Sequence, residues 1–165
     1  MRKFELEQGD LYFGNHEIGE SLEDIDDAQD FLDTKLDQFF GNRPEYREYI
    51  DLYGKIHGLD RYALLAAHAD TNGKWVYFDG EREYAVQSWI NEVDGKYSGL
   101  LLCVCNPRSH IPKSKKSILV VPDSDIDFRP WSERDPIFSL LVPKVGELDS
   151  YTIGYETEQL RKQLD

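Results

Sequence analysis

This chain has few of the features that would assign a function at once. It holds only two cysteines among 165 residues, and its glycines form neither a Walker loop nor a dinucleotide fingerprint. It also has no apolar run of about 18 residues, which is the length that a membrane span requires. We therefore expect no cofactor and no membrane partner.

The two cysteines, Cys103 and Cys105, stand two positions apart on one apparent strand. Residues at that spacing are roughly 6 to 7 Å apart at their Cα atoms, which is at the limit for a disulfide. Residues 1–5 turn acidic before any apolar stretch, unlike a signal peptide. Reduced thiols and the lack of a signal peptide together predict a cytoplasmic location.

Basic residues are also scarce. The chain has 19 Lys and Arg against 32 Asp and Glu, for a formal charge of −13, which argues against a nucleic-acid partner. The charge is uneven, because residues 1–40 hold three basic and twelve acidic side chains. Residues 108–116 reverse the sign: they contain no carboxylate and four cations, namely Arg108, Lys113, Lys115 and Lys116.

What is present favours one folded unit. A chain of 165 residues with 40% hydrophobic and 31% charged residues is ordinary for a globular protein. Its length allows burial of roughly two-thirds of the extended surface. We predict a single α/β domain over residues 1–165.

Two apolar runs each end in a reactive residue. Residues 62–67 run into His68, and residues 99–104 run into Cys105. A continuous apolar run of about six residues is typical of a strand buried on both faces. Chemistry in open α/β sheets collects at the carboxyl ends of such strands. If the two strands are parallel neighbours, His68 and Cys105 emerge at the same edge of the sheet.

The remaining pattern alternates helices with strands, which predicts a mainly parallel sheet with helices on both faces. The connection from 61 to 104 reads as strand, small hairpin, helix and strand, and it is long enough for a crossover between parallel strands. The other expected elements are a short strand or a hairpin within 3–13, helices over 22–40 and 46–58, a strand at 75–78, a helix at 86–93, strands at 117–121 and 137–142, an edge strand at 151–155 and a helix at 156–164.

This segment resembles the caspase-like cysteine peptidases. In that group a hydrophobic strand ends in the catalytic histidine, a small β-excursion and a helix follow, and a second hydrophobic strand ends in the nucleophilic cysteine. Here these strands are residues 64–68 and 100–105, and the two residues are 37 positions apart. Ala69 stands where glycine is usual, and Asn106 follows the cysteine, which would suit a diverged or inactive member. The resemblance covers about a third of the chain.

The resemblance implies a caspase-like three-layer sandwich and a cysteine endopeptidase activity on a peptide or protein. Cys105 would be the nucleophile and His68 the base. The backbone N–H groups of Ala69 and Cys105 would form the oxyanion hole, which stabilises the charge that develops on the carbonyl oxygen. Because positive charge attracts anionic substrates, Arg108 and Lys113 would bind substrate, with acidic side chains or a phosphate favoured.

Other interpretations of the same residues stay open. Cys105 is also what a small buried apolar residue looks like, and His68 a hydrogen-bonded residue at a strand end. The basic loop is equally a solvated segment that balances an acidic chain. No pair among His57, His68, Asp70, Cys105 and His110 has a recognised metal-ligand spacing, so we predict no metal site. A non-catalytic protein-interaction module on the same scaffold is the alternative function.

Overall fold

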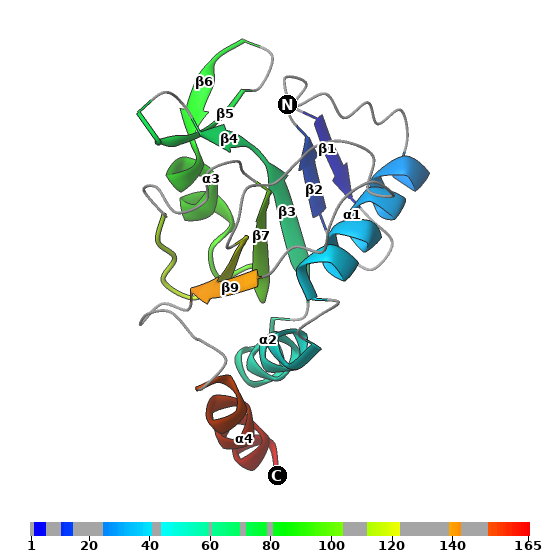
Figure 1. The fold of residues 1–165 in the computed structure, drawn as a ribbon, viewed down its shortest axis with the longest axis vertical. Coiled ribbons are helices and arrows are strands. Elements are labelled where there is room, and N and C mark those ends of the chain that lie inside the picture. Colours follow the sequence, from blue (N-terminus) through cyan, green and yellow to red (C-terminus); the bar gives the residue numbers. More distant parts are fainter. Residues whose placement is uncertain are drawn as a thin grey trace.

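A computed structural model describes residues 2–5, 11–14, 25–40, 44–59, 61–69, 72–78, 81–103, 112–122, 139–142 and 152–165. They form a mixed α/β fold (Figure 1). The strands are β1 (Arg2–Glu5), β2 (Leu11–Gly14), β3 (Tyr62–Ala66), β4 (His68–Ala69), β5 (Trp75–Phe78), β6 (Glu83–Ala85), β7 (Gly99–Cys103), β8 (Ile118–Pro122) and β9 (Ser139–Val142). The helices are α1 (Ile25–Phe40), α2 (Pro44–His57), α3 (Val86–Val93) and α4 (Ile153–Leu164).

The larger sheet has the strand order β1-β2-β3-β7-β8-β9. Its four central strands, from β2 to β8, run parallel to one another. The edge strands β1 and β9 pair antiparallel with their neighbours. The expected N-terminal hairpin is therefore present as β1 and β2, and β2 also joins the parallel core. The sheet is parallel in its centre and mixed at its edges.

Both faces of this sheet are covered, because side chains of a strand alternate between faces. One face, which we call the α2 face, packs against α1, α2 and α4 and includes Leu64, Leu101 and Val120. The opposite face, which we call the α3 face, packs against α3 and the small sheet and includes Leu65, Leu102 and Val121. All six of these side chains are fully buried. Helices on both faces were predicted from the sequence, and the structure confirms them.

Helices α1 and α2 form where the apolar spacing predicted them. In α1 the buried residues Ala28, Leu32 and Leu36 recur every four positions, so one side of the helix is apolar. In α2 the buried stripe includes Tyr46, Tyr49 and Ile50.

Helix α2 ends in a close approach to the chain that follows it. The Leu59 N–H donates to the Gly54 carbonyl oxygen at 2.7 Å, and Gly58 has φ +71°, a left-handed conformation that favours glycine. A Cβ atom on Gly54 would stand 1.9 Å from the Leu59 carbonyl oxygen and 2.9 Å from the Ser98 Cβ. Only glycine fits at position 54 without moving backbone.

Strands β4, β5 and β6 make a separate antiparallel sheet. It lies between β3 and α3 in the chain and beyond the carboxyl end of β3 in space (Figure 1). Trp75 and Tyr77 of β5 are buried in the α3 face, and the Tyr77 ring stacks on Tyr84 with centroids 5.4 Å apart. The sequence predicted β5 and the helix after it, but not the short strand β6.

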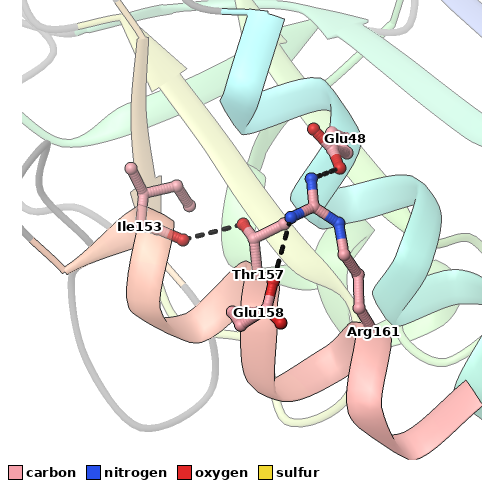
Figure 2. A network of polar contacts seen from close by, with 5 residues as sticks. All are labelled: Glu48, Ile153, Thr157, Glu158 and Arg161. Atoms are coloured by element: carbon pink, nitrogen blue, oxygen red, sulfur yellow. Dashed lines mark hydrogen bonds and ion pairs between the residues drawn. The ribbon is translucent and has the colours of Figure 1, made fainter.

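The prediction of an edge strand over residues 151–155 is wrong. Residues 153–164 form α4, which packs against α2 (Figure 1). The buried residues Ile153, Thr157 and Leu160 recur at four- and three-residue steps, so they form a helical stripe rather than an alternating one. The Thr157 hydroxyl donates to the Ile153 carbonyl oxygen at 2.7 Å, which ties this polar side chain to the first turn (Figure 2).

Polar contacts also link α4 to α2 at the surface. The Arg161 guanidinium pairs with Glu48 of α2 and with Glu158 of its own helix (Figure 2). In α2, burial raises the pKa of Tyr49 to about 12, with smaller contributions from the charge of Glu156 in α4 and from Tyr53. The terminal helix therefore covers a tyrosine of α2. No helix among the described residues is long and apolar enough to cross a membrane.

Candidate functional site

Strands β3 and β7 are neighbours and run parallel, as the sequence predicted. Their register pairs Tyr62 with Gly99 and ends by pairing Ala66 with Cys103. In the sequence, His68 follows Ala66 by two positions, and Cys105 follows Cys103 by two positions. In the sequence, the two reactive residues thus follow one paired position by the same number of residues.

The structure describes only part of the predicted catalytic set. His68 and Ala69 form β4, whose register pairs them with Val76 and Trp75 of β5. Cys105 and Arg108 lie outside the described residues. The remaining predicted residue, Lys113, is described and exposed.

Between the two strands, the chain has the order of elements that the sequence predicted. After β3 come the small sheet, then α3, then β7. Helix α3 packs on the α3 face through Val86, Trp89, Ile90 and Val93, at three- and four-residue steps. After β7, residues 112–117 contact the same helix. We call them the basic segment, because they contain Lys113, Lys115 and Lys116.

Lys113 is held at the first turn of α3 by Gln87. The Lys113 N–H donates to Gln87 Oε1 at 2.9 Å, and Gln87 Nε2 donates to the Lys113 carbonyl oxygen at 2.7 Å. Gln87 Nε2 also lies 2.9 Å from Asn91 Oδ1, one turn along the helix. The side-chain amide therefore pairs with the backbone of Lys113 as a neighbouring strand would.

The other end of the basic segment is held by Asp94, which follows the last turn of α3. Its carboxylate accepts three backbone N–H bonds, from Lys115 at 2.6 Å, Lys116 at 2.9 Å and Ser117 at 2.8 Å. Successive N–H groups that converge on one carboxylate form an anion-binding concavity. The backbone of residues 113–117 is therefore fixed at both ends of α3, while the side chains of Lys113, Lys115 and Lys116 are exposed.

Ser117 completes this attachment from the buried side. Its hydroxyl donates to the Tyr97 carbonyl oxygen at 2.7 Å and accepts from the Gly95 N–H at 2.8 Å. The Ser114 hydroxyl donates to the Ser117 carbonyl oxygen at 2.5 Å, and the Tyr53 hydroxyl donates to the Lys116 carbonyl oxygen. Both serines are buried, and these hydrogen bonds supply the partners that buried hydroxyl groups need.

These contacts shift two titrating groups. Burial alone would raise the pKa of Asp94, but the N–H groups of Ser117, Lys115 and Lys116 lower the pKa below its ordinary value. Burial raises the pKa of Tyr53, and the nearby Asp94 charge raises it further. Asp94 is thus an ionised carboxylate at neutral pH.

Neither Gln87 nor Asp94 is among the residues that the sequence predicted for the site. Their contacts join positions 21 to 26 residues apart, so no local pattern could reveal them. Within the described part of the chain, no three His, Cys, Asp or Glu side chains come together as a metal site would require.

Comparison with known proteins adds no relative. No family model, curated protein or solved structure matches the chain. Its class follows from the fold alone, which is mixed α/β with a parallel centre.

Proposed function

We propose that this protein is a cysteine peptidase-like hydrolase of caspase-like fold that acts on a peptide or protein. The single observation that carries the proposal is the pairing of β3 with β7, which ends with Ala66 opposite Cys103. Reactive residues that follow two adjacent parallel strands at equal spacing are positioned to share one edge of the sheet. Cys105 and His68 are that pair.

The chemistry assigned to the pair is acyl transfer. The Cys105 thiol gives its proton to His68, and the thiolate sulfur forms a bond to the carbonyl carbon of the substrate. The backbone N–H groups of Ala69 and Cys105 donate to the oxygen on which charge develops. The C–N bond then breaks as His68 returns the proton to the leaving amine, and water hydrolyses the thioester. Arg108 and Lys113 are the proposed substrate-binding residues.

Alkylation by iodoacetamide as a function of pH tests this proposal. The Cys103→Ala variant leaves Cys105 as the only thiol, so the modification rate belongs to one residue. A thiol beside an imidazole should react well below pH 8, because a free thiol has a pKa of about 8.5. The matched variant, Cys103→Ala with His68→Ala, should lose that advantage and react as a free thiol does.

Two outcomes would contradict the peptidase proposal. One is a Cys105 that reacts with the pH dependence of a free thiol. The other is a low-pH reactivity that persists in the His68→Ala variant. If the Cys103→Ala change disturbs folding, peptide mass spectrometry of the alkylated wild-type chain can separate modification at Cys105 from modification at Cys103.

A non-catalytic interaction module is the second candidate, and one observation favours it. Among its described side chains, helix α1 buries one stripe and exposes the carboxylates of Asp26, Asp30, Asp33 and Asp37. An exposed face of one charge sign can steer a basic protein partner. Unreactive Cys105 combined with salt-sensitive capture of a basic protein, lost when these four residues become Asn, would favour the module.

A further inference from the structure

A groove of about 500 Å³ lies between α1 and α2. The carboxyl-terminal end of α1 and one side of α2 line it, and its apolar lining residues are Leu36, Phe40, Pro44 and Leu52. Leu36 and Phe40 are buried, whereas Leu52 is half-buried and Pro44 is exposed. The groove therefore offers apolar surface to the solvent, and its volume exceeds that of one leucine or phenylalanine side chain.

The wall that α2 contributes to this groove has no net formal charge. Its charged lining residues are two cations, Arg47 and Lys55, and two carboxylates, Glu48 and Asp51. Asp51 accepts a hydrogen bond from the Tyr62 hydroxyl at 2.7 Å, and the Arg47 guanidinium carbon lies 6.0 Å from the centroid of the same tyrosine ring. Tyr62 of β3 thus holds side chains of both signs on the α2 wall.

The wall that α1 contributes is negative. Asp37 lines the groove, and with Asp26, Asp30 and Asp33 it forms a row of exposed carboxylates that we call the aspartate stripe. Spacings of four, three and four residues place these side chains on one side of the helix. Asp33 accepts from the neutral Gln29 amide at 3.0 Å, and this contact leaves its charge uncompensated. The groove therefore lies at the end of a line of negative charge.

Apolar lining and negative charge together define the chemistry of an occupant. An apolar side chain gains free energy when the groove removes its surface from water. A segment that carries Lys or Arg is attracted by the aspartate stripe, whereas an acidic segment is repelled by it. From Asp26 to Asp37 the helix rises by roughly 16 Å, at about 1.5 Å per residue, which matches a helical segment of about 12 residues.

We propose that this groove binds a basic segment of a partner protein and receives one large apolar side chain of that segment between α1 and α2. The apolar lining residues contact this side chain, and the aspartate stripe faces the Lys and Arg residues beside it. The site needs neither His68 nor Cys105, so it holds or fails separately from the peptidase proposal. It also requires more than an acidic face, because an apolar side chain must fill the groove.

Three fluorescent peptides, titrated with the full chain at physiological salt and followed by fluorescence anisotropy, test the site. The probe is a peptide of about 12 residues of alanine and lysine with one central leucine. One matched peptide has alanine in place of the leucine, and the other has glutamate in place of every lysine. Saturable binding is expected for the probe, about tenfold weaker binding for the alanine peptide, and no binding for the glutamate peptide.

Two outcomes of the peptide titrations would overturn the proposal. One is a probe that shows no saturable binding. The other is equal binding of the probe and the alanine peptide, which would show a response to charge alone and would leave the acidic face without a groove site.

Matched leucine variants place the apolar contact in the groove. Leu52→Gln removes apolar lining and should weaken probe binding about tenfold. Leu164→Gln makes the same change at an exposed position of α4 and should leave the affinity unchanged. If Leu52→Gln is not folded by circular dichroism, Pro44→Ser at an exposed position of the lining takes its place. Equal affinities of the groove variant and the α4 variant would overturn the proposal.

Matched charge variants place the basic residues of the probe on α1. Asp30→Asn combined with Asp33→Asn removes two charges of the aspartate stripe and should weaken binding about threefold, because each exposed pair contributes little. Glu83→Gln combined with Glu92→Gln removes the same charge from exposed positions of β6 and α3 and should have no effect. Equal weakening by the two pairs would show a response to net charge and would also overturn the proposal.

Discussion

The two faces of the central sheet are covered in different ways. On the α2 face, three helices pack through apolar and tyrosine side chains, and the polar contact that links α2 to α4 is an exposed ion pair. The α3 face is covered by one helix of eight residues and a small sheet. Gln87 of that helix and Asp94 at its end bind the backbone of Lys113 and Lys115. The α2 face thus contributes mainly apolar packing, whereas the α3 face also fixes backbone near the candidate site through side-chain hydrogen bonds.

Replacement of Trp89 by alanine should have the largest effect of the changes considered. Trp89 is 1% exposed and is the largest fully buried side chain among the described residues. Its loss should lower the free energy of unfolding by about 4 kcal/mol, through lost transfer energy and the cavity left behind. Chemical denaturation measures this, and Trp89→Phe should lose less because it keeps most of the apolar volume.

The same variant sharpens the comparison between the faces. Ile50→Ala on the α2 face should cost about 3 kcal/mol, because Ile50 is also fully buried. Among molecules that remain folded, only the Trp89 variants should speed amide hydrogen exchange at Lys115 and Lys116, since Asp94 at the end of α3 holds these N–H groups. Equally fast exchange in Ile50→Ala would contradict the separate roles of the two faces.

Gly54→Ala should be next in size. The added methyl group would meet backbone 1.9 Å away, so α2 would have to shift away from Leu59 and Ser98 at a cost of about 3 kcal/mol. Gly154→Ala is the matched control, because no atom lies within 4 Å of the position that its Cβ would occupy. Thermal unfolding should separate the two clearly, and a neutral Gly54→Ala would mean that α2 does not pack this closely.

Asp94→Ala should cost about 2 kcal/mol, because three backbone donors lose a charged acceptor. Asp94→Asn keeps an acceptor oxygen and should cost less. The loss should also loosen residues 113–117, which amide hydrogen exchange of the Lys115 and Lys116 N–H groups can measure. Unchanged protection of these groups in Asp94→Ala would show that Asp94 does not hold the basic segment.

The lowered pKa of Asp94 also predicts an acid dependence. A carboxyl group whose pKa is lower in the folded chain stabilises it at pH values above the unfolded pKa of about 3.8, and the stabilisation disappears as pH falls through the folded pKa. The difference in the free energy of unfolding between wild type and Asp94→Asn, measured by denaturation, should therefore be smaller at pH 3 than at pH 6. An equal difference in the free energy of unfolding at the two pH values would contradict a lowered pKa of Asp94.

The ion pair on the α2 face should matter least. Arg161 and Glu48 are each about half exposed, with side-chain exposures of 48% and 44%. Exposed pairs of this kind contribute little, since solvent and salt screen them. A double-mutant cycle of Glu48→Gln and Arg161→Gln should give a coupling near the error of the measurement. A large coupling energy would show that this ion pair contributes substantially to the packing of α4 on α2.

Much of this architecture could be predicted from the sequence. The three- and four-residue spacing of apolar residues located α1, α2 and α3, and the continuous apolar runs located β3, β7 and β8. In residues 151–155, Ile153 stands between two tyrosines at alternate positions, and this alternation is typical of a strand. Packing of Ile153, Thr157 and Leu160 against α2 outweighs that pattern, and no local signal reports such packing.

For the site, the sequence identified strand ends but not the scaffold around them. The connection between β3 and β7 is long enough for a crossover and so allows them to be parallel neighbours, but only the register of the two strands shows that they are. The attachments made by Gln87 and Asp94 depend on side chains that meet backbone more than twenty positions away. Glutamine and aspartate with such partners look the same in sequence as solvent-exposed ones.

The parallel centre of the sheet also has a consequence for how the chain folds. Leu100 pairs with Leu119 across 19 positions, Ala63 with Leu100 across 37, and Leu11 with Ala63 across 52. Closing longer loops costs more chain entropy, and non-local pairing slows folding. We expect the β7–β8 ladder to form before the β3–β7 ladder, and β2 to dock last. Until β2 docks, the apolar edge of β3 is exposed and can pair with other copies of the chain. We therefore expect refolding to need a low protein concentration, which rapid dilution provides.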